Sequence, residues 1–373
     1  MDFSGTVDRR VPIQYNIGRK QGRDDDMKER SPGLDLVRTL AVLCVLVTHA
    51  IAYTGVMDAS PATPAWCVYL VLRFAAMAGV PLFLLLSGYL CCDKKFSRTY
   101  YGGGISVVLS YLLIAAAVVI LCTVTGLQKF TLWEGVRGIL NFTAHGYAWY
   151  VEMYLGLFLL IPFLNLIFHG LPSAKSRLVL IVTLAVITLL PPTLESFRVG
   201  GASLDITGDY WRAMYPLTYY FIGAFIRKHP PKLSRIARLA LAGIALAIPC
   251  VLCFAFTLRD GAYAWYMMNG FASVTAAMTG VAFFLLLYDL PLRSKPIRFG
   301  LKEISVCSFE IYLFSYITDQ GIVRVLDHVG IHRASVRLLL IVIGSLVASY
   351  VASRLLRLLI VPFAGWIRRR VNL

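Results

Sequence analysis

The sequence carries little charge for its length. Only 15% of its 373 residues are Asp, Glu, Lys or Arg, whereas 58% are hydrophobic and the mean hydropathy is +0.71. A soluble globular domain has about 25% charged residues, so this composition excludes a soluble fold. The sequence instead contains long apolar runs with few charged residues. We conclude that the chain is an integral membrane protein.

A cleavable signal peptide is also missing from the start of the chain. The first 33 residues are hydrophilic and mix both signs of charge, as in DDDMKER, so they contain no apolar core of the kind that a signal peptide needs. We expect residues 1–33 to form a disordered cytosolic tail, and residues 34–373 to form one transmembrane domain.

The eight cysteines do not show the pattern of a disulfide framework. Seven of the eight cysteines lie within apolar runs or at their ends, where they behave as small hydrophobic residues. Cys250 and Cys253 form a C-x-x-C pattern, but it lies in an apolar helix without neighbouring histidines. We therefore expect neither disulfides nor a metal site.

Acidic residues are few compared with basic ones, and the formal net charge is +16. In a soluble protein this excess would indicate nucleic acid as a partner. Here the Lys and Arg residues lie in short loops between apolar runs, where the positive-inside rule accounts for them. We expect membrane lipids, and not nucleic acid, around this chain.

The apolar runs predict an all-α polytopic membrane protein with about ten transmembrane helices, since each run meets the length of roughly 17 to 25 residues that a span requires. The basic loops at 94–98, 175–177, 227–238 and 293–302 fall on one side together with the C-terminal WIRRR. That side is predicted to be the cytosol, so both termini are cytosolic and the protein is a multi-pass protein of the cell membrane. The runs lie at residues 34–53, 66–91, 104–125, 148–168, 178–193, 213–226, 236–257, 265–289, 304–323 and 335–364.

The first span, LDLVRTLAVLCVLVTHA, contains an acid, a guanidinium and an imidazole. Arg38 and His49 are eleven residues apart, so a helix places both on one face, about 16 Å apart along its axis. Asp35 precedes Arg38 at the spacing of an intrahelical ion pair. These groups either anchor the helix end and bond to a neighbouring helix, or they line an internal cavity.

Other spans also contain costly polar groups. Arg73 lies in the second span, Glu152 early in the fourth and Glu310 early in the ninth. Charges within spans usually face a cavity and need partners. By the predicted sides, Glu152 would lie in the leaflet of His49, and Glu310 would lie near Arg38.

Together these motifs resemble the acyltransferase 3 family, integral membrane enzymes that acylate surface glycans. The hallmark of that family is an Arg, ten residues and a His in the first helix, and Arg38 and His49 match it. Departures occur where many members have H-x-W, here Tyr147 to Trp149 with His145 two residues earlier, and at Ser315 and Glu310, where many have His and Gly. The further matching stretches are RFAAMAGVPLFLLLSGYL, WYVEMYLGLFLLIPFLN, YYFIGAFIRK and SFEIYLFS.

The resemblance implies transfer of an acyl group, most often acetyl, from cytosolic acyl-CoA to a hydroxyl of a surface or lipid-linked saccharide. His49 is then the general base or the carrier of a covalent acyl group, since its unperturbed pKa near 6.5 suits proton transfer. Arg38 binds the donor and Asp35 orients it. No tightly bound cofactor is expected. The residues expected to bind substrate are Arg73, Glu152, Trp149 and Glu310, and those expected to bind the CoA phosphates are Lys94, Lys95 and Arg98.

Two other functions compete with this interpretation. A polytopic transporter of a polar solute would use the same charged groups without binding CoA, but no inverted repeat is visible in the sequence. A scaffold for a polysaccharide synthase would tolerate changes at His49. Ser87 precedes Gly88, a pattern typical of close helix packing rather than of a nucleophile. The acyl group, the acceptor, the oligomeric state and any partner protein are open at this point.

Overall fold

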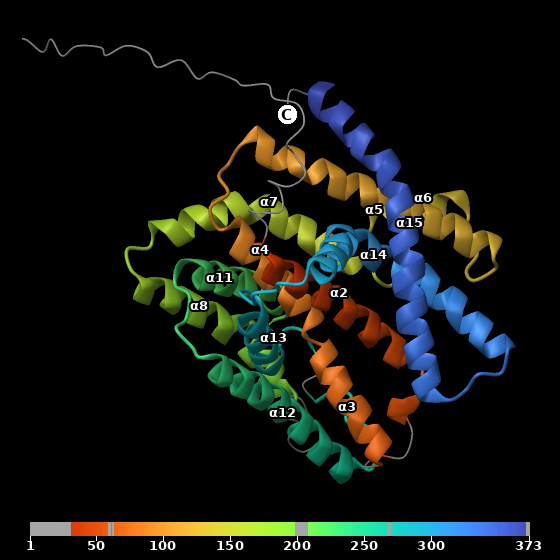
Figure 1. Cartoon of the computed structure of the whole chain (residues 1–373), viewed down its shortest axis with the longest axis horizontal. Helices are drawn as coiled ribbons and strands as arrows, with labels where there is room; N and C mark the ends of the chain where they lie inside the picture. Colours follow the sequence, from red (N-terminus) through yellow and green to blue (C-terminus); the bar gives the residue numbers. More distant parts are fainter. Residues whose placement is uncertain (1–30, 59–60, 62, 198–207, 268–269, 371–373) are drawn as a thin grey trace, which may run out of the picture. The chain divides into compact units, whose positions relative to one another are not determined.

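The computed structural model describes residues 31–58, 61, 63–197, 208–267 and 270–370, and over these ranges it contains helices and no strand (Figure 1). The expected all-α class is therefore confirmed. Most of the predicted tail, residues 1–30, lies outside the described residues, and its disorder stays a prediction. The helices are α2 (Pro32–Ala52), η1 (Val56–Asp58), α3 (Pro64–Ala76), α4 (Gly79–Cys91), α5 (Arg98–Val124), α6 (Leu132–Leu140), α7 (Trp149–Gly170), α8 (Ala174–Thr188), α9 (Leu190–Glu195), α10 (Asp209–Arg212), α11 (Tyr215–Lys228), α12 (Arg235–Asp260), α13 (Val274–Leu287), α14 (Lys295–His328) and α15 (Ala334–Arg370).

Nine of the ten predicted spans coincide with a helix or with a pair of consecutive helices, whereas the eighth, 265–289, contains α13 but begins nine residues before it. Within the described residues, seven helical segments are long and apolar enough to cross a membrane. The helices α11 and α13 are shorter, with 14 residues each, and the 34 residues of α14 include several charges. The count of ten and the cytosolic position of the termini therefore stay predictions. The seven segments are Pro32–Ala52, Pro64–Cys91, Arg98–Val124, Trp149–Gly170, Ala174–Glu195, Arg235–Asp260 and Ala334–Ile367.

Hydroxyl side chains begin several of these helices. Thr63 caps α3 by accepting a hydrogen bond from the backbone N–H of Trp66, and Ser97 caps α5 in the same way through Tyr100. Such caps satisfy N–H groups that have no partner within the helix. At α6, Thr131 and Glu134 form a reciprocal capping box. The short polar segments between apolar runs thus define where each helix starts.

The second predicted span is divided into α3 and α4 at Met77 and Ala78. Pro81 explains the break, because it has no N–H to donate to the carbonyl four residues earlier and its ring crowds that carbonyl. At this break Gly79 lies against α2, where an added Cβ would be 2.9 Å from the carbonyl oxygen of Ala41. The break therefore allows α2 and α4 to approach closely.

The first span occupies a central position among the helices. Figure 1 shows α2 with α4 and α14 beside it, and it contacts α3, α4, α13, α14 and α15. Val37, Ala41 and Leu46 on α2 are completely buried. The polar side chains of α2 are consequently surrounded by protein, which is where charges within a span are tolerated.

The basic loops gather at the end of the bundle where Arg38 lies. Thr39, next to Arg38, donates a hydrogen bond to the carbonyl of Leu301 near the start of α14. The same end holds the loops after α4, α7, α11 and α13, which side-chain contacts join to one another. These contacts are Lys228–Asp93 at 2.6 Å, Arg177–His229 at 3.2 Å and Arg238–Asp289 at 2.7 Å.

Candidate active site

His49 lies in the last turn of α2, with its side chain four-fifths buried. Its ring stacks on that of Tyr147, with centroids 3.6 Å apart and planes 19° from parallel. Its Nδ1 atom is 4.0 Å from Oδ2 of Asp319 on α14. Three segments far apart in the sequence therefore meet at this imidazole: the end of α2, the residues before α7 and the middle of α14.

Asp319 is completely buried and receives hydrogen bonds from two hydroxyl groups. Tyr147 donates to Oδ2 at 3.0 Å, and Ser345 on α15 donates to Oδ1. Asp319 was not among the predicted site residues, although it is an acid inside the ninth apolar run. The rule that flagged Glu310, namely that charge within a span is expensive, applies equally to Asp319.

Tyr147 lies directly before α7 and makes several contacts at this site. Besides stacking on His49 and bonding to Asp319, its backbone carbonyl accepts a hydrogen bond from the hydroxyl of Tyr312. The backbone N–H of Tyr147 donates to Nδ1 of His145 at 3.3 Å, which places any ring proton of His145 on Nε2. Burial lowers the pKa of His145 to about 4, so this imidazole is neutral at physiological pH.

Arg38 is held near the start of α2 through a serine of another helix. Its Nη1 donates to Oγ of Ser305 at 3.0 Å, and Ser305 in turn donates to Oδ1 of Asp35 at 2.7 Å. The Arg38 and Asp35 side chains are themselves 3.9 Å apart. Asp35 therefore lies at the spacing expected for orienting Arg38, and Ser305 adds a bridge that the sequence did not reveal.

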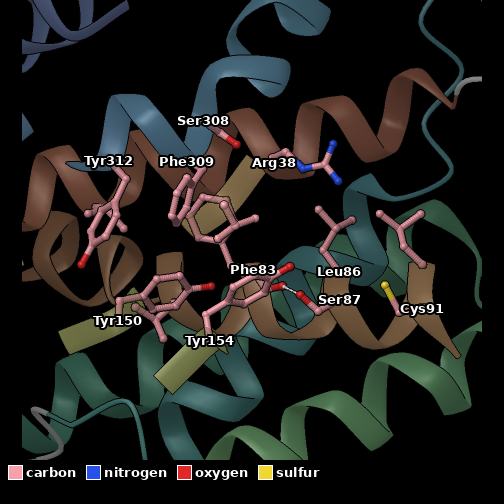
Figure 2. A pocket seen from close by; sticks show the side chains of 14 residues that line it. Arg38, Phe83, Leu86, Ser87, Cys91, Tyr150, Tyr154, Ser308, Phe309 and Tyr312 are labelled. Atoms are coloured by element: carbon pink, nitrogen blue, oxygen red, sulfur yellow. Dashed lines mark hydrogen bonds between the residues drawn. The ribbon is translucent and has the colours of Figure 1, made fainter. Parts of the chain in front are cut away.

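A pocket of about 210 Å³ lies between α2, α4, α7 and α14 (Figure 2). Arg38 lines one part of it and Tyr312 another, and the Tyr312 ring centroid is 6.5 Å from that of His49. His49 itself does not line the pocket. The pocket is lined by Arg38, Val45, Val80, Phe83, Leu86, Ser87, Leu90, Cys91, Val107, Tyr150, Tyr154, Ser308, Phe309 and Tyr312.

The predicted donor-binding residues Lys94, Lys95 and Arg98 lie in the segment after α4 and are exposed. None of them lines the pocket, but Cys91, which does, lies within electrostatic range of both Lys94 and Arg38. The basic segment is therefore next to the end of the pocket that carries Arg38.

Two of the predicted substrate-binding residues have protein partners. Glu310 accepts hydrogen bonds from Arg357 at 2.9 Å and from Ser110 at 3.2 Å, so it bonds to α15 and α5, whereas Arg38 bonds to Ser305. Arg73 is buried, and its guanidinium lies 4.8 Å from the ring centroid of Trp265.

The other two predicted substrate-binding residues lie at the start of α7, directly after Tyr147. Trp149 is 38% exposed and stacks on Phe271 with centroids 5.8 Å apart. Glu152 is exposed one turn later. Both are accessible from outside the protein at the end of the molecule where His49 lies.

Comparison with known families identifies the family of this chain. The sequence model of a family described as an acyltransferase domain matches residues 31–357. The chain belongs to the acyltransferase 3 family. No curated protein and no solved structure matches it. The matched range of the acyltransferase includes every residue of the site described above, from Asp35 on α2 to Arg357 on α15.

Proposed function

We propose that this acyltransferase moves an acyl group, acetyl in the first instance, from acyl-CoA to a hydroxyl of a cell-surface or lipid-linked saccharide. The donor approaches from the Arg38 end, which the positive-inside rule assigns to the cytosol. The acceptor approaches from the His49 end. The reaction takes place within the cell membrane and needs no tightly bound cofactor.

One observation carries this proposal: the pocket runs along the helix that bears both Arg38 and His49. Arg38 and Val45 of α2 line it, and so does Tyr312, whose ring centroid is 6.5 Å from that of His49. Eleven helical residues span about 16 Å along the axis. An extended pantetheine arm is of comparable length, so a thioester held by Arg38 can place its carbonyl near Tyr312 and His49.

His49 supplies proton transfer in this reaction. It takes the proton of the acceptor hydroxyl, whose oxygen forms the new C–O bond while the C–S bond of the thioester breaks. The same proton then passes to the departing thiolate, and the imidazole returns to its neutral form. Direct transfer and transfer through an acyl-imidazole both require His49 at this position.

Arg38 and the basic segment after α4 bind the donor. Ser305 and Asp35 hold the Arg38 guanidinium in place, so it need not first be ordered when it binds the donor. Lys94, Lys95 and Arg98 are exposed and can reach the phosphates of CoA outside the pocket.

Trp149 and Glu152 are the better placed of the proposed acceptor-binding residues. An exposed indole offers an apolar face on which a sugar ring can stack, and a carboxylate accepts hydrogen bonds from sugar hydroxyls. Arg73 and Glu310 are proposed with them, but the side chains of both already contact protein groups.

The test measures alkali-labile acyl groups on surface polysaccharide. A host that lacks the gene is complemented with wild type, His49→Ala or Arg38→Ala at matched membrane levels. We expect wild type to restore acylation, and His49→Ala to lower it by about 100-fold or more, the usual contribution of a general base. Arg38→Ala should lower it at limiting donor.

Control variants keep this test specific. His332 and Arg293 are exposed, and neither lines the pocket, so His332→Ala and Arg293→Ala should acylate as wild type does. Acylation restored by His49→Ala would contradict the proposal. A transporter would show no release of free CoA thiol, so His49-dependent thiol release separates the two functions.

A further inference from the structure

We propose that Asp319 is the positioning partner of His49, and that Tyr147 and Ser345 hold its carboxylate in place. This inference rests on the proposed function, since it assigns a role to the neighbours of the proposed base. None of these three residues belongs to the Arg-x10-His motif or to the basic segment after α4. The first observation is that the Asp319 side chain is completely buried.

A carboxylate that is completely buried requires compensation. Within the described residues, the one group able to carry positive charge within 4.0 Å of Asp319 is the His49 imidazole. The two hydrogen bonds that Asp319 accepts come from neutral hydroxyl groups. Burying an acid among neutral donors stabilises the fold poorly, which is why acids of this kind mark functional sites in membrane proteins.

The two hydroxyl donors restrict where the carboxylate can point. Ser345 bonds to Oδ1 and Tyr147 bonds to Oδ2, so both oxygens are held. Oδ2 is the atom that faces Nδ1 of His49, at 4.0 Å. No hydrogen-bond partner for Nδ1 exists among the described residues. A small rotation of the imidazole would bring the two atoms within hydrogen-bond distance, with the carboxylate unmoved.

Tyr147 controls that rotation. Its ring stacks on His49, which restricts tilting of the imidazole, while its hydroxyl donates to the same oxygen that faces Nδ1. The backbone carbonyl of Tyr147 accepts a hydrogen bond from the hydroxyl of Tyr312. Close by, the side-chain amide of Gln320 donates to the hydroxyl of Tyr53. Tyr147 is therefore fixed at its backbone, its ring and its hydroxyl.

The chemical consequence concerns the proton that His49 takes from the acceptor. With Nδ1–H directed at Asp319, Nε2 is left with its lone pair free to accept that proton. The imidazolium that forms then has a carboxylate beside it. No proton needs to reach Asp319, because its role is to orient the ring and to stabilise its charged form.

The experiment compares apparent kcat and KM for the donor in inverted membrane vesicles that contain the full chain. The probe is acetyl-CoA with a radiolabelled acetyl group, and the readout is alkali-labile label in the acceptor fraction. We expect Asp319→Asn to lower kcat by at least about 10-fold while KM for acetyl-CoA changes less than about twofold. Asp319→Glu should recover part of the lost kcat.

Two further variants keep the test informative if Asp319→Asn folds poorly. Tyr147→Phe keeps the ring that stacks on His49 and removes the hydroxyl that donates to Asp319, and Ser345→Ala removes the other bond. Both should lower kcat by about 3- to 10-fold with KM unchanged, the loss expected when one hydrogen bond is removed. Tyr147→Leu, which also removes the stacking, should lower it further.

The outcomes separate this inference from the function on which it rests. If His49→Ala is inactive but Asp319→Asn and Tyr147→Phe keep wild-type kcat, the positioning role is wrong and the proposed function stands. If the losses fall on donor KM and not on kcat, the positioning role is equally wrong. If His49→Ala is as active as wild type, the proposed function itself fails.

Discussion

At the scale of single residues, Glu310 pairs with Arg357. The contribution of this pair to stability tells whether Glu310 has a structural role in addition to its proposed binding role. The Glu310 carboxylate is almost fully buried and bonds to Arg357 at 2.9 Å. Glu303 and Arg354 form a second pair between the same two helices at 2.6 Å, with Arg354 half exposed. Exposed ion pairs contribute little stability, whereas breaking a buried one leaves a charge without compensation.

We therefore expect Glu310→Gln to lower the free energy of unfolding by about 1 to 3 kcal/mol, and Glu303→Gln to lower it by less than about 1 kcal/mol. Thermal unfolding of the purified protein in detergent measures both. A double-mutant cycle with Arg357→Met isolates the coupling between the partners. Equal effects of the two glutamine variants would show that burial of the Glu310 pair has no energetic consequence.

Single residues also show where reasoning from the sequence stops. The spacing of Arg38 and His49 placed both on one face of the first span, and the structure has them on α2 beside one pocket. Ser305 and Ser345 could not be found in this way, and Asp319 could be recognised as an acid within a span but not as a neighbour of His49. Their contacts depend on the depth and rotation of α14 and α15 relative to α2, which an apolar run does not encode.

At the scale of helices, α4 and α11 touch through their backbones at two glycines. An added Cβ at Gly88 would lie 1.9 Å from the carbonyl oxygen of Tyr220, and one at Gly223 would lie 2.0 Å from that of Leu85. These atoms belong to the backbone and cannot move aside without separating the helices. The prediction that the Ser-Gly pattern serves close packing agrees with this geometry.

Gly88→Ala should therefore destabilise the protein by about 1 to 3 kcal/mol or more, and Gly223→Ala should do the same. Gly243 on α12 has open space where its Cβ would be, so Gly243→Ala is the matched control, and it gains up to about 1 kcal/mol of helix propensity. The measurement is the fraction of monodisperse protein and its melting temperature. A Gly88→Ala variant as stable as Gly243→Ala would refute the close approach.

The basic end of α11 is tied to the segment after α4 by an ion pair with a defined pH dependence. Lys228 donates to Asp93 at 2.6 Å, and this contact lowers the pKa of the Asp93 carboxyl below its ordinary value of 3.8. A lowered pKa means that the stabilisation is complete above the ordinary pKa and is lost as the pH falls through the folded-state pKa.

Asp93→Asn should lower stability at neutral pH by about 0.5 kcal/mol or less, because Asp93 is largely exposed and solvent screens the pair. The difference from wild type should shrink below pH 3.8. Melting temperatures across this range test the expectation, with Asp209→Asn as the control at another exposed acid. A difference that persists unchanged in acid would contradict it.

At the scale of the whole molecule, the basic loops lie together at the Arg38 end, so their side of the membrane decides the direction of the reaction. The positive-inside rule predicts that this end and both termini face the cytosol. A C-terminal green fluorescent protein should therefore fluoresce, and alkaline phosphatase fused there should be inactive. Alkaline phosphatase inserted after Gly126, in the connection between α5 and α6, should be active.

The same fusions also test the direction of transfer. The opposite result, with an active phosphatase at the C-terminus, would place Arg38 on the outer side, where CoA is absent, and the proposed donor could not reach the pocket.

The all-α class and the segments that form helices followed from the sequence because apolar length determines them. The orientation in the membrane is predicted from the charge of the loops, because this charge acts during membrane insertion. The contacts within the folded protein do not determine it.

Tyr312 lines the pocket next to His49, with its hydroxyl bonded to the carbonyl of Tyr147 and its ring edge-on to Tyr150. A thioester is unstable toward hydrolysis whenever a base and water reach it together. While the Tyr312 ring stays in place, a donor bound in the pocket meets neither His49 nor water from the opposite side of the membrane. We therefore expect the enzyme to show little acyl-CoA hydrolysis in the absence of acceptor, and Tyr312→Ala to make that wasteful reaction measurable.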